Sequence, residues 1–145
     1  MFARPGLKKR RIGFVSGAVA VTVVSVVLTR TAFARITVNT VDTLAVVADN
    51  GRHLVLTGPI ACTPDDRAYL EVTVTQRATG AVAAGRTRIT CSGAVAQWEL
   101  HASTRGAECF QEGPATAVAL ARTANGIGMT DAHQWLVRIS LIAEQ

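Results

Sequence analysis

Short runs in which apolar and polar residues alternate make up most of the chain after residue 35. The clearest is residues 68–76, where Leu70, Val72 and Val74 alternate with polar side chains. A period of two is typical of a strand that buries one face and exposes the other. Similar runs occupy residues 36–41, 44–48, 53–62, 86–91, 95–103 and 135–141.

Turn residues separate these runs. Asp49-Asn50-Gly51 favours a tight turn because Asn and Gly tolerate positive φ. Pro59 lacks an N–H donor, so we expect an edge, a bulge or a break at this position. Residues 115–124 are ambiguous because their alanines favour a helix, but their alternation and the preceding Gly113-Pro114 favour a strand.

The strand pattern predicts the fold class. We expect an all-β domain, an antiparallel immunoglobulin-like β-sandwich of seven or eight strands, with a barrel as the alternative. An N-terminal hydrophobic helix, described next, is expected to precede it.

A different pattern occupies the first 34 residues. Basic residues between Arg4 and Arg11 precede an apolar run over residues 12–28, which is the layout of a secretory leader. Ala32 and Ala34 place small residues where a signal peptidase cleaves, so the sequence predicts a signal peptide over residues 1–34 and a β-sandwich domain over residues 35–145. The alternative is an uncleaved membrane anchor, again with the domain outside the cytoplasm.

Charge is divided unevenly between these two parts. Six of the 15 basic residues and none of the 10 acidic ones lie in residues 1–34, so residues 35–145 carry nine arginines, no lysine and ten carboxylates, a net charge of −1. The arginines occur singly among acids or neutral residues. The sequence therefore predicts no nucleic-acid partner.

Cysteine and tryptophan positions indicate how the small core is completed. Cys62 and Cys91 each fall on the inward parity of a predicted strand, which predicts a disulfide between them. Cys109 is then left over, either as a half-buried free thiol or as the site of an intermolecular disulfide. Trp98 and Trp135 also lie on inward parity, so we expect both in the core.

No motif in the sequence predicts catalysis. His53, His101 and His133 stand far apart in the chain without Cys, Asp or Glu at a metal-ligand spacing, so we predict no metal site and expect solvated histidines. We also predict no catalytic and no cofactor-binding residues, and no enzyme. The alternative is a Ser-His-Asp triad that only the folded chain assembles.

Two sets of charged residues are expected to have structural roles. Asp65-Asp66 follows a proline and is expected to form a turn with solvated charges. Arg77, Arg86 and Arg88 could grip an anionic polymer, but we expect a solvated strand face that discourages edge-to-edge pairing of sheets.

The order of several motifs is shared with other proteins. These motifs are Cys62, the strand 71–77, Gly85, Thr90-Cys91-Ser92-Gly93, Gln97-Trp98 and Gly113-Pro114-Ala115. Over most of residues 55–145 the succession resembles small secreted actinobacterial proteins of uncharacterised function. The resemblance implies a leader peptide and an immunoglobulin-like sandwich, and no catalytic residues. Apoproteins that carry enediynes are a more distant likeness, since they use two disulfides and this chain can form one.

The sequence thus predicts a secreted, monomeric binding module that is not an enzyme and needs no cofactor. Its partner would be an extracellular ligand or a cell-surface component, bound through loops or an exposed sheet face. Membrane contact is expected only through the leader, if it is uncleaved. The alternatives are an envelope-associated structural protein, anchored by the N-terminal helix or linked through Cys109, and a small secreted hydrolase.

Overall fold

The structure, a computed structural model, describes residues 35–145. The predicted leader, including its cleavage site at Ala32 and Ala34, lies outside the described residues. All strands, the disulfide and the hydrophobic core described below lie within residues 35–145, so this part contains a complete core of its own.

No helix within the described range is long and apolar enough to cross a membrane.

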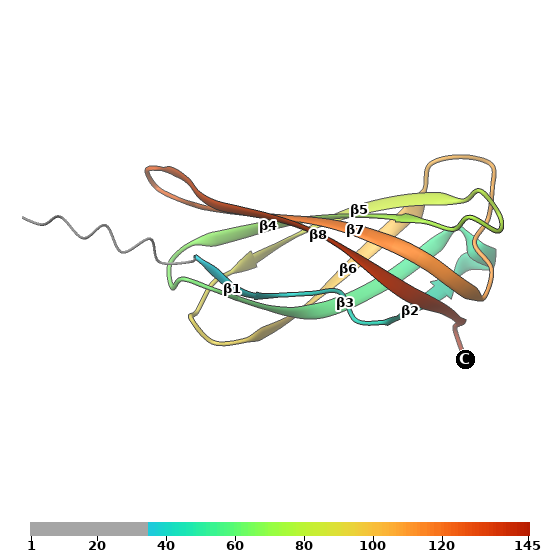
Figure 1. Cartoon of the computed structure of the whole chain (residues 1–145), viewed down its shortest axis with the longest axis horizontal. Coiled ribbons are helices and arrows are strands. Elements are labelled where there is room, and N and C mark those ends of the chain that lie inside the picture. The colour runs from blue at the N-terminus through green and yellow to red at the C-terminus, as the bar shows by residue number, and fades with distance from the viewer. Residues whose placement is uncertain (1–34) are drawn as a thin grey trace, which may run out of the picture. The chain divides into compact units, whose positions relative to one another are not determined.

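The described chain consists of eight strands and one short 3-10 turn (Figure 1). In chain order they are β1 (Ile36–Asn39), β2 (Leu44–Ala48), η1 (Asp49–Gly51), β3 (His53–Cys62), β4 (Arg67–Thr75), β5 (Val82–Thr90), β6 (Ala96–Thr104), β7 (Gly113–Asn125) and β8 (Gly128–Ala143). The all-β prediction and the strand count are confirmed. The ambiguous residues 115–124 form part of β7, where small buried alanines alternate with larger outward residues.

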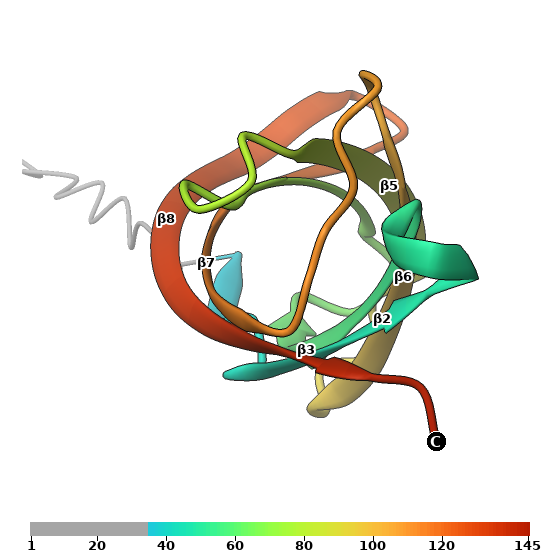
Figure 2. The same ribbon diagram turned by 90° about the vertical axis from the view of Figure 1, so that its right-hand side faces the viewer.

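The sheet is continuous and closes on itself. The strand order is β1-β3-β2-β8-β7-β4-β5-β6, and β3 also pairs with β6, so seven strands form a barrel with β1 added at one side of β3 (Figure 2). Neighbouring strands are antiparallel except β2 and β8, which pair in parallel. Of the two predicted architectures, the hydrogen-bonding pattern therefore favours the barrel over two separate antiparallel sheets.

A break between β1 and β2 makes this arrangement possible. Both strands pair with the same side of β3, and residues 40–43 between them connect to it through Thr40 N–H to Pro59 O at 3.4 Å and Asp42 N–H to Thr57 O at 2.8 Å. The N–H and C=O groups of one strand residue point toward the same neighbouring strand. Because Pro59 O accepts from Thr40 N–H, the N–H that proline lacks would also point to this side of β3, where the ladder is interrupted. The sequence predicts an edge, a bulge or a break at Pro59; β3 itself continues through this residue, and the interruption lies in the neighbouring ladder, between β1 and β2.

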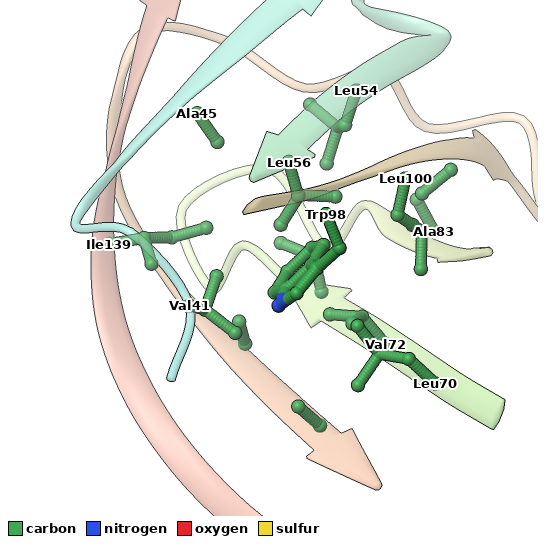
Figure 3. Packing of buried hydrophobic residues seen from close by; sticks show 14 of the residues in the cluster. Val41, Ala45, Leu54, Leu56, Leu70, Val72, Ala83, Trp98, Leu100 and Ile139 are labelled. Carbon is green, nitrogen blue, oxygen red and sulfur yellow. The ribbon is translucent and has the colours of Figure 1, made fainter. Parts of the chain in front are cut away.

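Trp98 occupies the middle of the core (Figure 3). Its ring is surrounded by the fully buried Leu56 and Val72 and by Val41, which is almost fully buried. Gly58 is required opposite it, because a Cβ atom there would lie 2.6 Å from the Trp98 ring. The prediction of Trp98 as a core residue is confirmed, while Trp135 is only partly buried and packs against the core from β8.

The disulfide joins Cys62 at the end of β3 to Cys91 just after β5, with a Cα–Cα distance of 5.2 Å. This confirms the pairing predicted from strand parity. A buried disulfide is consistent with an oxidising environment. Cys109 is a free, partly buried thiol in the loop between β6 and β7, and its Cβ lies beside Gly51.

Candidate functional site

Arginines gather on the outward side of the four strands β5, β4, β7 and β8. We call this surface the arginine face; its charged residues are Arg67, Arg86, Arg88, Arg122, Arg138 and Glu71. All five arginines are exposed, and they outnumber the single carboxylate, so the face carries a net charge of +4. The rest of residues 35–145 holds four arginines and nine carboxylates, a net charge of −5. The domain is nearly neutral in total but strongly polarised.

Tyr69 lies at the centre of the most arginine-rich part of this face. On β4 it is directly opposite Arg88 of β5 and Arg122 of β7, and Arg67 precedes it by two residues on the same side. Directly opposed side chains have Cβ atoms about 4.5–5.5 Å apart. The Tyr69 side of the sheet thus presents an aromatic ring, 40% exposed, between guanidinium groups that can stack on it or bind a ligand beside it.

Three open hollows lie along the arginine face. One of about 310 Å³ is lined by Asp65, Arg67, Tyr69, Ala124, Asn125 and Gly126. A second of about 180 Å³ lies on the other side of Tyr69, beside Arg86 and Arg122. The largest, about 770 Å³, lies at the other end of the face between Arg77 and Arg138. Shallow hollows spread along a sheet suit an extended ligand or surface better than one enclosed small molecule.

Most of these arginines lack a protein partner. Arg86 pairs with Glu71 at 3.1 Å, whereas Arg67, Arg88 and Arg122 make no ion pair within the described residues. Their guanidinium groups are therefore available to an external anion.

Edge protection, which the sequence suggested for the arginines, explains only part of this arrangement. Arg67 and Arg122 lie on β4 and β7, and each of these strands is paired on both sides. Protection of a sheet edge gives no reason for cations on central strands. Arg77 follows the end of β4 and is separated from the Tyr69 group by the length of the strand.

Asp66 is buried, which corrects the prediction of two solvated carboxylates. Its side chain is an acceptor for the Thr130 hydroxyl at 2.9 Å, and it lies 3.1 Å from Arg35 Nε. Of the two carboxylates only Asp65 is exposed, and its backbone has a positive φ of 69°. The sequence could not show this difference because Arg35 and Thr130 lie far from Asp66 along the chain.

Replacing Asp66 by alanine is expected to lower the free energy of unfolding by about 2 kcal/mol. Breaking a fully buried ion pair costs about 3–5 kcal/mol, but the Arg35 side chain is 30% exposed and regains water. The measurement is chemical denaturation of residues 35–145. Asp65→Asn is the control, because asparagine removes the exposed charge and also tolerates the positive φ, and its expected change is under about 0.5 kcal/mol; equal effects of the two substitutions would contradict the assignment.

Two histidines that are distant in sequence meet on the outward side of β3 and β6. His53 Nε2 and His101 Nδ1 are 2.8 Å apart, and His101 Nε2 lies 3.0 Å from Glu99 Oε1. Both rings lie at the surface of the domain, and their contact could not be seen from their separation in the sequence. His133 instead lies 3.1 Å from Asp131 on β8.

The histidines do not complete a recognisable catalytic or metal centre in the part of the chain that the structure describes. There, no group of three or more His, Cys, Asp or Glu side chains is placed to hold a metal ion. No serine hydroxyl in residues 35–145 hydrogen-bonds to a histidine ring either, so no Ser-His-acid triad is assembled there.

Comparisons with known proteins found no matching protein-family model and no match among curated proteins.

Proposed function

We propose that residues 35–145 are an exported, non-enzymatic binding domain that holds an anionic component of the extracellular surface on the arginine face. The observation that carries this proposal is the charge separation: the arginine face holds five arginines and one carboxylate, in a domain whose remaining surface is acidic.

The chemistry of arginine supports an oxyanion as the ligand. A guanidinium group offers planar, paired N–H donors that match carboxylate, sulfate and phosphate groups. Arg88 and Arg122 lie on strands separated by β4, so their backbones are about 10 Å apart. A rigid sheet that repeats cations at such spacings fits a polymer or a surface with many negative groups. Tyr69 would add stacking area between them.

Export is part of the proposal because two separate observations agree with it. The leader predicted over residues 1–34 directs the domain out of the cytoplasm, and the Cys62–Cys91 disulfide fits an oxidising compartment. The net charge of the proposed mature domain is slightly negative. Binding of an anion would therefore depend on the arginine face and not on the total charge.

A relationship to immunoglobulin-like sandwiches is proposed on topology. β1, β3 and β6 form one layer, and β8, β7, β4 and β5 form the other (Figure 1). The layers are joined by only two residue pairs between β5 and β6, and by the parallel pairing of β2 with β8. These few connections support an immunoglobulin-like sandwich whose two sheets are joined at their edges. The resemblance to small secreted actinobacterial proteins also implies such a sandwich.

The proposal is tested by removing two arginines beside Tyr69. We expect Arg88→Gln with Arg122→Gln to weaken the binding of residues 35–145 to heparin, a soluble polyanion, by about tenfold and to reduce the salt dependence of binding. The measurement is isothermal titration calorimetry at several salt concentrations.

The matched control is Arg52→Gln with Arg105→Gln, which makes the same change in net charge at exposed positions outside the face. The control should bind heparin as the wild type does. Equal weakening in both double variants would show that total charge governs binding and would refute a site at Tyr69.

A further inference from the structure

The turn between β7 and β8 exposes two apolar side chains. Ile127 is 97% and Met129 70% exposed. Asn125 Oδ1 accepts hydrogen bonds from the backbone N–H groups of Ile127 at 2.8 Å and Gly128 at 3.2 Å, so the turn is closed by its own side chain and holds Ile127 at the apex. Such positions usually carry polar residues or glycine, because water surrounds them.

The aromatic and basic residues of the arginine face begin directly beside this apolar tip. In the strand register Arg67 is opposite Ala124, one residue before the turn, and Tyr69 is opposite Arg122. Moving inward from the tip, a ligand therefore meets first two apolar side chains, then Arg67 beside the exposed Asp65, and then a tyrosine flanked by arginines. Side chains occur in this order where a protein enters the interface of a bilayer, with apolar groups deepest and Tyr and Arg at the headgroups.

The described chain also begins at this end of the barrel. Arg35 is held by Asp66, and the Ile36 N–H donates to Asp131 Oδ2 at 3.1 Å, three residues after the start of β8. Figure 1 shows the start of β1 and the β7–β8 turn at the same end. The predicted leader joins the described domain at Arg35, so an uncleaved leader would connect to the domain at this end.

We propose that the β7–β8 end docks on a lipid bilayer with anionic headgroups. Ile127 and Met129 enter the interfacial region, Arg67, Arg88 and Arg122 contact headgroup phosphates, and Tyr69 lies at headgroup depth. The inference rests on the proposed anion-binding function and names its ligand. It goes beyond the prediction that only the leader would contact the membrane.

A bilayer explains more of the surface than a soluble polymer does. A polymer would use the arginines but would give no role to an isoleucine and a methionine held in water at the apex of a closed turn. Two apolar side chains and three cations provide weak, reversible binding that depends on anionic lipid and falls with salt. Such binding would keep the domain at the membrane surface whether or not the leader is cleaved.

The test is sedimentation of residues 35–145 with vesicles of equal parts phosphatidylglycerol and phosphatidylcholine, compared with pure phosphatidylcholine vesicles. Ile127→Asn with Met129→Gln should lower the partition coefficient for the anionic vesicles by about tenfold and leave heparin binding unchanged. Leu136→Gln is the matched control, because Leu136 is 65% exposed on the same face but lies in the middle of β8. It should bind vesicles as the wild type does. Unchanged melting temperatures would show that all variants are folded.

The two proposals fail in different ways. Wild-type protein that binds heparin but not anionic vesicles would overturn lipid docking and leave the anion-binding function intact. Binding to neither would overturn both. Vesicle binding that is unchanged in the tip variant, or equally reduced in Leu136→Gln, would overturn the role of the hairpin tip.

Discussion

Replacing Trp98 by alanine is expected to lower the free energy of unfolding of residues 35–145 by about 3–5 kcal/mol. The indole lies in the middle of the barrel against Leu56 and Val72, and Gly58 leaves no side chain to refill the space. The expected loss combines the transfer of buried apolar surface to water with the cavity that remains. Since small domains are stable by about 5–15 kcal/mol, this is a large share of the total. Urea denaturation followed by circular dichroism measures it.

Trp98→Phe is the informative control. Trp98 Nε1 is buried without a hydrogen-bond partner among the described residues, and an unpaired buried donor costs about 1–3 kcal/mol. Phenylalanine keeps much of the ring and removes this donor, so its loss of stability should be well below that of alanine. A phenylalanine variant as unstable as the alanine variant would contradict the central packing role of the ring.

Removing the disulfide is expected to cost about 3–4 kcal/mol. The bond joins residues 29 apart in sequence, and closing a loop of that size restricts the unfolded chain by about this amount. It also connects the end of β3 to the end of β5, where β5 no longer pairs with β6. Cys62→Ser with Cys91→Ser should therefore melt at a markedly lower temperature than the wild type under oxidising conditions.

Cys109→Ser is the control for the disulfide variant. Cys109 is a free, partly buried thiol, so its replacement should change stability by less than about 0.5 kcal/mol. A non-reducing gel of the wild type tests its other predicted role, since an intermolecular disulfide would give a dimer that Cys109→Ser abolishes. A Cys62→Ser/Cys91→Ser melting curve that coincides with the wild type would refute the stabilising role of the bond.

The strands could be predicted from sequence because their pattern is local. In β4, Leu70 and Val72 alternate with outward residues, and inward parity was enough to pair Cys62 with Cys91. The alanines of β7 form a strand against their helix propensity, because alternate positions are buried between β4 and β8. In each of these segments burial on one face decides the structure.

Closure of the sheet was not predictable in the same way. It depends on the pairing of β3 with β6, which are separated by two strands in the chain, and on the parallel pairing of β2 with β8. No local pattern encodes these long-range choices. The N-terminal leader remains a prediction, since it lies outside the described residues.

The candidate site shows the same division between local and long-range information. Outward parity identified Arg86 and Arg88, but the strand register that places them around Tyr69 with Arg122 was not available from the sequence. The sequence predicts a solvated Asp66 because the partners of this side chain, Arg35 and Thr130, come from other segments. Surface clusters assembled from several strands need the topology before they can be recognised.

The most direct test of the binding surface is an amide NMR titration of residues 35–145 with a short heparin oligosaccharide. We expect shift changes concentrated on β4, β5 and β7 around Tyr69, Arg88 and Arg122, with little change on the outward side of β3 and β6. Changes centred on the His53 and His101 side, or no changes at saturating ligand, would contradict an anion-binding site on the arginine face.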